Sequence, residues 1–260
     1  MSITEKDDRL VVQGIAKSFG GVLALSGADL TAKSGEILSI IGPNGAGKTT
    51  LLNGISGVYP PDRGKVLLDG EDITGLAPYK VAEHGIARTF QNVALFSGMT
   101  VLDNIMLGRN THMSTGVISC GLFWGRAQKE EIAHREVVEA IIDFLEITDI
   151  RKVPVGALPL GLQKRVELGR AMAAEPKVLM LDEPMGGMNL EEKESMARFV
   201  LDIIETTETA VILIEHDMGV VMDISDHIIV LDQGTKIAEG HADEVRNDPV
   251  VIEAYLGKPH

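Results

Sequence analysis

Residues 42–49 of the chain read Gly42-Pro43-Asn44-Gly45-Ala46-Gly47-Lys48-Thr49. They match the pattern G-x-x-x-x-G-K-[ST] and follow directly on the apolar run 37–41. A glycine-rich turn between a strand and a helix lets backbone N–H groups curl around phosphate groups, while the positive end of the helix faces them. We expect Lys48 to reach the β- and γ-phosphates and the Thr49 hydroxyl to ligate Mg²⁺. With Thr50 opening the helix behind it, this segment predicts a phosphate-binding loop (P-loop) for a nucleoside triphosphate.

Four short runs rich in Ile, Val and Leu are typical of strands buried on both faces of a parallel sheet. They stand at residues 37–41, 178–181, 210–214 and 228–231. Segments around residues 10–15 and 66–68 lie beside turn signals and favour strands of an antiparallel layer near the N-terminus. The expected fold class is therefore α/β, a P-loop NTPase core with an N-terminal antiparallel β layer.

The middle of the chain differs, because apolar residues recur there at helical spacing from about residue 101 to residue 157. This spacing predicts a helical subdomain inserted into the α/β core. Residues 110–125 within it are rich in Gly, Ser and Thr, yet residues 117–118 and 122–124 are apolar. Two interpretations stay open: a loop folded onto its own helices, or a docking surface for a partner. Towards the C-terminus, residues 243–257 predict two short helices separated by a proline.

Composition and charge narrow the function classes. The chain has 260 residues, with 24 Lys and Arg against 38 Asp and Glu, so its formal net charge is −14. This charge disfavours broad, salt-dependent attachment to nucleic acid or anionic lipid. The single cysteine, Cys120, excludes an intramolecular disulfide and a four-cysteine zinc site. The N-terminus has no apolar core typical of a secretory signal, and no apolar run approaches the roughly 18 residues that span a bilayer.

Polar side chains follow two of the predicted strands. Asp182 and Glu183 come directly after the run 178–181, and His216 follows the run 210–214. Ligands of α/β sheets bind beyond the carboxyl ends of the strands, so we expect these side chains to turn toward one crevice. Asp182 suits a water-mediated contact with Mg²⁺, Glu183 suits the base that polarises an attacking water, and His216 suits a contact with the γ-phosphate.

The order of these parts resembles the ATP-binding cassette (ABC) ATPases over about residues 10–257. The resemblance implies ATP and Mg²⁺ as cofactors. It implies that Phe19 stacks on adenine, and that Gln91 joins the core to the helical subdomain and senses Mg²⁺ and the attacking water. On this basis the catalytic residues would be Glu183, His216 and Gln91, and the metal would be held by Thr49, Gln91 and Asp182.

The segment Leu158-Pro159-Leu160-Gly161-Leu162-Gln163-Lys164-Arg165, called here the signature segment, occupies the place of the family motif L-S-G-G-Q. Pro159 replaces the serine and Leu160 the first glycine, which leaves Gly161 in register. The serine hydroxyl is missing, but the N-terminus of the following helix still offers backbone N–H groups to an anion. The resemblance implies that nucleotide is sandwiched between two such subunits, with Gly161 facing the other subunit's phosphate loop. Asn189 similarly replaces the aspartate of the family's D-loop.

The same resemblance suggests how the chain divides into parts. Residues 1–98 would form the N-terminal part of the ATPase core with the phosphate loop, 99–157 the helical subdomain, 158–240 the signature helix and the C-terminal part of the core, and 241–260 a C-terminal helical tail.

Within the family, the chain looks like the branched-chain amino acid importer group, and like the longer of that importer's two ATPase subunits. The serine-free signature and residues 187–192, 214–218 and 247–257 carry this likeness, and residues 110–128 would be the extension of the longer subunit. The implied partners are a second ABC ATPase subunit, either a shorter paralogue or a second copy, two membrane permeases and, indirectly, an extracytoplasmic solute-binding protein, with no nucleic acid. The implied location is the cytoplasmic face of the inner membrane, as a peripheral protein.

Two alternatives remain. One is the ATPase of another ABC system, such as lipopolysaccharide export, whose signature usually keeps its serine, so that Pro159 counts against it. The other is a soluble ABC ATPase acting on ribosomes or DNA, which a single cassette, the lack of heptads and the charge of −14 disfavour. The solute also stays open among branched-chain amino acids, urea, amides and aromatic acids.

Overall fold

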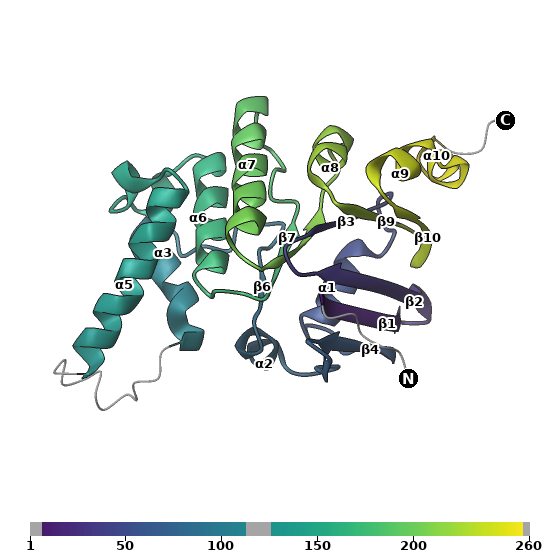
Figure 1. The fold of residues 1–260 in the computed structure, drawn as a ribbon, viewed down its shortest axis with the longest axis horizontal. Coiled ribbons are helices and arrows are strands. Elements are labelled where there is room, and N and C mark those ends of the chain that lie inside the picture. The colour runs from purple at the N-terminus through teal and green to yellow at the C-terminus, as the bar shows by residue number, and fades with distance from the viewer. Residues whose placement is uncertain (1–6, 113–125, 257–260) are drawn as a thin grey trace.

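The computed structural model describes residues 7–112 and 126–256, in which two sheets are flanked by helices (Figure 1). The strands are β1 (Asp8–Phe19), β2 (Val22–Lys33), β3 (Ile37–Ile41), β4 (Arg63–Leu68), β5 (Glu71–Asp72), β6 (Ile86–Arg88), β7 (Val178–Asp182), β8 (Ala210–Ile214), β9 (His227–Asp232) and β10 (Thr235–Gly240). The α-helices are α1 (Lys48–Ile55), α2 (Pro78–Glu83), α3 (Val101–Met106), α5 (Arg126–Phe144), α6 (Leu160–Met172), α7 (Leu190–Thr206), α8 (Met218–Ile224), α9 (Ala242–Asn247) and α10 (Pro249–Leu256), and the 3-10 helices are η1 (Leu107–His112), η2 (Thr148–Ile150) and η3 (Val155–Ala157).

A six-stranded sheet with the order β10-β9-β3-β8-β7-β6 forms the centre of the molecule. The neighbours from β9 to β6 run parallel, and only β10 is antiparallel to its partner β9. Every residue of β3, β7 and β8 is buried. The four apolar runs predicted as strands of a parallel sheet all lie in this sheet, so the predicted α/β class is confirmed.

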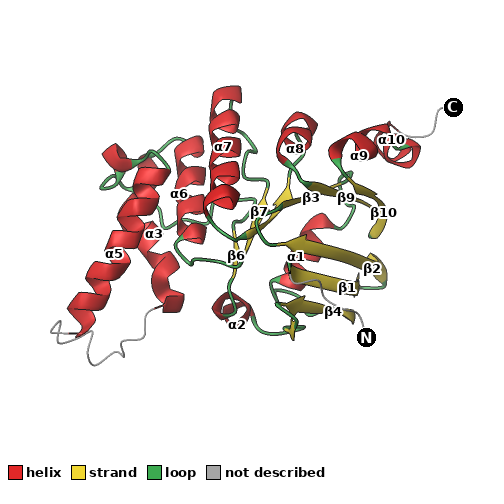
Figure 2. Cartoon of the chain, in the orientation of Figure 1, coloured by secondary structure: helices red, strands yellow, loops and turns green. Residues whose placement is uncertain are grey.

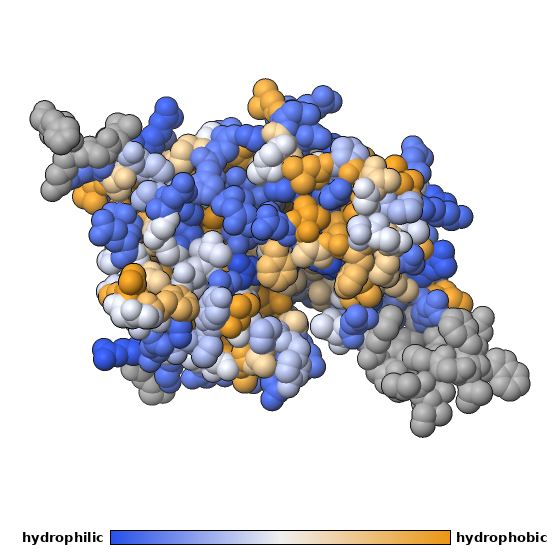
Figure 3. Space-filling view, turned by 180° about the vertical axis from the view of Figure 1, so that it is seen from behind, coloured by the Kyte–Doolittle hydropathy of each residue, from blue (hydrophilic) through white to orange (hydrophobic). Residues whose placement is uncertain are grey.

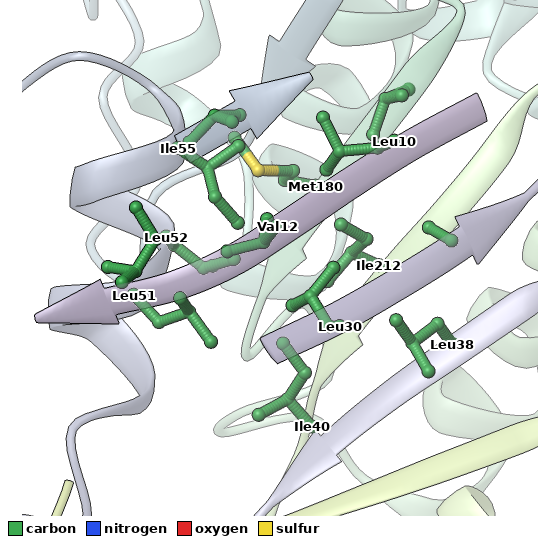
Figure 4. Packing of buried hydrophobic residues seen from close by; sticks show 14 of the residues in the cluster. Leu10, Val12, Leu30, Leu38, Ile40, Leu51, Leu52, Ile55, Met180 and Ile212 are labelled. Atoms are coloured by element: carbon green, nitrogen blue, oxygen red, sulfur yellow. The ribbon is translucent and has the colours of Figure 1, made fainter. Parts of the chain in front are cut away.

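Alternate side chains of these strands enter two different cores, which explains why the runs are apolar throughout. Leu38, Ile40, Met180 and Ile212 pack with α1 and the antiparallel sheet, as Figure 4 shows. The residues between them in sequence, such as Leu179, pack on the other face against α5, α6 and α7. Each strand therefore needs apolar residues on both faces.

The second sheet has the order β2-β1-β4-β5, and all its neighbours are antiparallel. It shares a core with α1 on one face of the six-stranded sheet, whereas α5, α6 and α7 pack on the other face. Figure 2 shows the antiparallel strands well apart from these three helices. Strands β1 and β4 contain the segments 10–15 and 66–68, so the predicted N-terminal antiparallel layer is confirmed.

The described part of residues 101–157 contains helices, as the spacing predicted, and helices α3, α5 and α6 lie together at one end of the molecule (Figure 1). The two predicted C-terminal helices are α9 and α10, and Pro249 begins the second. The apolar residues 117–118 and 122–124, Cys120 and most of the expected extension lie outside the described residues, and the division into four parts stays a prediction.

The surface mixes hydrophilic and hydrophobic side chains, and Figure 3 shows hydrophobic residues interspersed with hydrophilic ones on the back face. In the two described ranges, no helix combines the length and the apolar character needed to cross a membrane.

Candidate functional site

The phosphate loop connects the end of β3 to the start of α1, where Gly47 is the N-cap with φ 101°. Two of its glycines are required by space as well as by backbone conformation. A Cβ on Gly42 would lie 2.0 Å from the carbonyl oxygen of Leu231, and a Cβ on Gly47 would lie 2.7 Å from that of Ala24. The loop is therefore held against β9 and β2 by contacts that only glycine permits.

A cavity of about 270 Å³ opens over this loop. It is lined by Ala24, Asn44, Gly45, Ala46, Gly47, Lys48, Thr49, Thr50, Gln91, Glu183 and His216. The structure thus brings the predicted phosphate loop together with three of the predicted side chains from distant parts of the sequence.

Lys48 lies under the loop with only 6% of its surface exposed. Its Nζ donates to the carbonyl oxygens of Gly42 (2.7 Å) and Pro43 (3.1 Å), so its position is fixed by the loop itself. Burial lowers the pKa of Lys48, and the negative charges of Glu183 and Asp182 oppose that shift. The arrangement presents a confined ammonium group beside backbone N–H groups, which suits phosphate oxygens.

Glu183 forms the centre of a hydrogen-bonded group that also lines the cavity. Its Oε2 accepts from Gln91 Nε2 at 3.1 Å, and its Oε1 accepts from His216 Nε2 at 2.8 Å. The backbone of Glu183 has φ 52°, a left-handed conformation that is uncommon for a residue with a side chain. The three side chains follow the ends of β6, β7 and β8, which are neighbours in the sheet. A carboxylate held in this way can accept a proton from a water that lies in the cavity.

Asp182 behaves differently from its neighbour Glu183. It is 1% exposed, and its Oδ2 accepts from Arg88 Nη2 at 2.8 Å, while the Arg88 guanidinium also donates to Asn53 Oδ1 at 2.6 Å. Its other oxygen, Oδ1, is buried and has no hydrogen-bond partner among the described residues. The expectation that both carboxylates turn into the crevice therefore fits Glu183, which lines the cavity, whereas Asp182 is buried and is not a lining residue.

Phe19 and Gly161 lie outside the residues that line the cavity. Phe19 is 41% exposed at the end of β1, and its ring makes an edge contact with Tyr59 at a centroid distance of 5.3 Å. Gly161 lies in the first turn of α6, where an added Cβ would come 2.3 Å from Glu192 Oε1. Contacts of Phe19 with adenine and of Gly161 with a second subunit stay predictions.

Arg88 and Ala24 are residues at this site that the sequence did not point to. Arg88 lies on β6 with its backbone paired to Met180, which places its side chain beside Asp182. Its only signal in the sequence is its position three residues before Gln91. Ala24 reaches the loop from β2, and a lone alanine carries no signal of this kind.

A larger cavity of about 480 Å³ lies at the amino ends of β7 and β8. Its walls are mostly apolar and come from α5, the end of α6 and α7, including Ile141, Phe144 and Ile203. None of the predicted site residues lines it, so the smaller, polar cavity is the candidate site.

Comparison with known proteins agrees with this geometry. Residues 25–186 match the family model described as ABC transporter, and residues 235–260 match the model described as branched-chain amino acid ATP-binding cassette transporter. The chain is 41% identical over 252 residues to the high-affinity branched-chain amino acid transport ATP-binding protein BraF of Pseudomonas aeruginosa, covering 96% of this chain and 98% of that protein. It is 40% identical over 253 residues to LivG of Escherichia coli, which has the same description, with the same coverage.

Solved structures lead to the same family. A nucleotide-free ATP-binding cassette from an ABC transporter superposes with a TM-score of 0.83 at 34% identity, covering 96% of this chain and 100% of that one. The ADP conformation of the cassette MJ1267 gives a TM-score of 0.83 at 32% identity, with coverage of 96% and 99%. The chain therefore belongs to the ABC transporter family, as an ATP-hydrolysing cassette of the group that contains the branched-chain amino acid transport ATP-binding proteins.

Proposed function

We propose that this chain energises the uptake of branched-chain amino acids as an ATPase subunit of an ABC importer, with Glu183 as the base, Gln91 and His216 beside it, and Lys48 on the phosphates. The observation that carries the proposal is that one cavity is lined both by Lys48 and by the hydrogen-bonded group of Gln91, Glu183 and His216. The names of BraF and LivG support the choice of solute.

Magnesium fits the oxygen atoms that this site offers. Thr49 and Gln91 line the cavity, and the buried Oδ1 of Asp182 lacks a hydrogen-bond partner within the described residues, which suits a carboxylate that meets a hydrated cation. The proposed ligands are Thr49, Gln91 and Asp182, the last through water. When bound, Mg²⁺ neutralises charge on the phosphate oxygens.

The residues of the chain perform the remaining steps. The loop N–H groups and Lys48 bind and orient the phosphates, so that the terminal phosphorus faces Glu183. Glu183 accepts the proton of the attacking water, and Gln91 and His216 fix the direction of its carboxylate. Phe19 is proposed to stack on the adenine at the edge of the site.

The proposed assembly contains a second ATPase subunit, two membrane permeases and an extracytoplasmic solute-binding protein, with this chain on the cytoplasmic face of the membrane. Gly161 would face the phosphate loop of the second ATPase subunit. The names of the relatives as transport ATP-binding proteins support this assembly.

The experiment combines hydrolysis with transport. Glu183→Gln keeps the shape and hydrogen bonds of the side chain but removes a basic carboxylate, so phosphate release from ATP should fall by roughly 10²- to 10⁴-fold while nucleotide binding persists. Cells without this protein should lose uptake of radiolabelled leucine, and wild-type protein but not the Glu183→Gln variant should restore it. Unchanged phosphate release in the variant would remove Glu183 from the role of base, and unchanged leucine uptake in the deleted strain would contradict the choice of solute.

A further inference from the structure

Two buried charged side chains lie one turn apart on α6, the helix that begins within the signature segment. Lys164 is 6% exposed and Glu167 is 4% exposed. Burial of a charge is costly unless hydrogen bonds and opposite charges compensate it. Neither residue lines the cavity, so neither binds nucleotide directly. Their partners instead are the two segments that carry Glu183 and Gln91.

Lys164 holds the backbone of Glu183. Its Nζ donates to the Glu183 carbonyl oxygen at 2.7 Å, and the same oxygen accepts from the Gly186 N–H at 3.2 Å. The N–H of Glu183 in turn donates to the carbonyl oxygen of Ile214 at 2.9 Å. These bonds hold the left-handed backbone of Glu183, a conformation that costs about 1 kcal/mol or more and persists only where surrounding contacts fix it.

Glu167 holds both sides of the segment that carries Gln91. Its Oε1 lies 3.3 Å from the Phe90 N–H and 3.4 Å from the Ala94 N–H, and accepts from both. Arg170, one turn further along α6, donates to the Ala94 carbonyl oxygen at 2.6 Å and lies 3.9 Å from the Glu167 carboxylate. One face of α6 therefore fixes residues 90–94 at each end.

We propose that Lys164 and Glu167 are positioning residues for ATP hydrolysis, which tie the direction of α6 to the placement of Glu183 and Gln91. The inference rests on the proposed function of Glu183 and Gln91. The hydrogen bond between these two side chains is 3.1 Å long. Glu183 is anchored to α6 through its own carbonyl oxygen, whereas Gln91 is anchored through the backbone N–H groups of Phe90 and Ala94 on either side of it. A movement of α6 that begins at the signature segment thus reaches both groups next to the attacking water.

The test measures kcat and KM for ATP on the full chain in complex with its partner subunits. Lys164→Met removes the donor at similar length, and Glu167→Ala removes the acceptor. Because both residues act through the segments that they hold, kcat should fall at least ~10-fold while KM and the affinity for a fluorescent ATP analogue change less than ~2-fold. Glu167→Gln keeps an oxygen acceptor and should recover most of the kcat lost in Glu167→Ala.

Arg198→Met is the matched control, because Arg198 is an exposed cation on α7 that pairs with Glu146 at 2.9 Å and does not line the cavity. Its kcat should stay within ~2-fold of wild type. Unchanged kcat in both Lys164→Met and Glu167→Ala would overturn the inference, as would a parallel loss of kcat and nucleotide affinity, which indicates a general structural role. The proposed function fails separately, if Glu183→Gln itself keeps wild-type hydrolysis.

Discussion

The cavity over the phosphate loop is proposed to bind the triphosphate of this chain, and the start of α6 to meet the triphosphate of the second subunit. The two regions differ in how complete they are within one chain. The cavity has an internally bonded set of groups, in which Glu183 accepts from Gln91 and His216. At the start of α6, Pro159 is the N-cap, no side chain among the described residues caps this end, and Leu160 beside it is 44% exposed. A helix end that leaves its first N–H groups without side-chain acceptors is suited to a ligand or partner from outside.

This difference indicates which contacts each part contributes. The cavity provides charge, a base and a fixed geometry, so its variants should change nucleotide affinity or turnover. The start of α6 provides backbone groups and a precise fit against Glu192, so its variants should change stability and association more than the chemical step.

Lys48→Ala should produce the largest change in nucleotide affinity. The variant removes a charged donor that loop carbonyls already hold in place, and hydrogen bonds to charged groups contribute about 1.5–3 kcal/mol. We expect nucleotide affinity to weaken roughly 10- to 100-fold, measured by calorimetric titration with ATP and Mg²⁺. Lys65→Ala is the control, because Lys65 is an exposed cation on β4 that pairs with Asp72 at 3.7 Å. Equal affinities of the Lys48→Ala variant and wild type would contradict the role given to the cavity.

Gly161→Ala should have a smaller effect, visible as a coupling with Glu192. The new methyl group would displace the Glu192 carboxylate, which also accepts from the Asn189 N–H at 3.0 Å in the capping box of α7. Loss of one such bond costs about 1 kcal/mol. Gly161→Ala should therefore lower the free energy of unfolding by about 1 kcal/mol more in the wild-type protein than in the Glu192→Ala background.

Urea unfolding of the four proteins in this cycle measures the coupling. A coupling near zero would mean that Glu192 moves aside without loss, and the fit between the signature segment and α7 would then not restrict position 161. Alanine also has a higher helix propensity than glycine, but this contribution is the same in both backgrounds and cancels in the coupling.

The parts that were predictable from sequence depend on local patterns. Lys48 follows from the glycine-rich motif, and Glu183 and His216 follow from buried runs whose carboxyl ends meet at one edge of a parallel sheet. Each of these inferences needs only the chain on either side of the residue.

The parts that were not predictable depend on which elements become neighbours. Arg88 pairs with Asp182 because β6, a strand of only three residues, lies beside β7, and so short a strand has no periodic pattern. In the sequence, Lys164 and Glu167 are two charged residues of a predicted helix. Only the packing of α6 against the strand ends shows that both are buried. Gln91 was predicted from resemblance rather than from its own residue type.

The smallest effect that we expect is the difference in stability between Pro159→Ser and Pro159→Ala at the start of α6. Both variants lose the rigidity that proline gives the unfolded chain, so this contribution cancels between them. Position 159 has φ −64° and ψ 158°, an extended conformation from which a serine hydroxyl accepts a hydrogen bond from the first helical turn. The serine variant should be more stable than the alanine variant by about 1 kcal/mol in urea unfolding. Equal stability of the two variants would mean that the N–H groups at this helix end are not free to donate to a new acceptor. N–H groups that do not bind a serine oxygen of their own chain would not bind a phosphate from another subunit either. The contrast between this helix end and the cavity would then lose its basis.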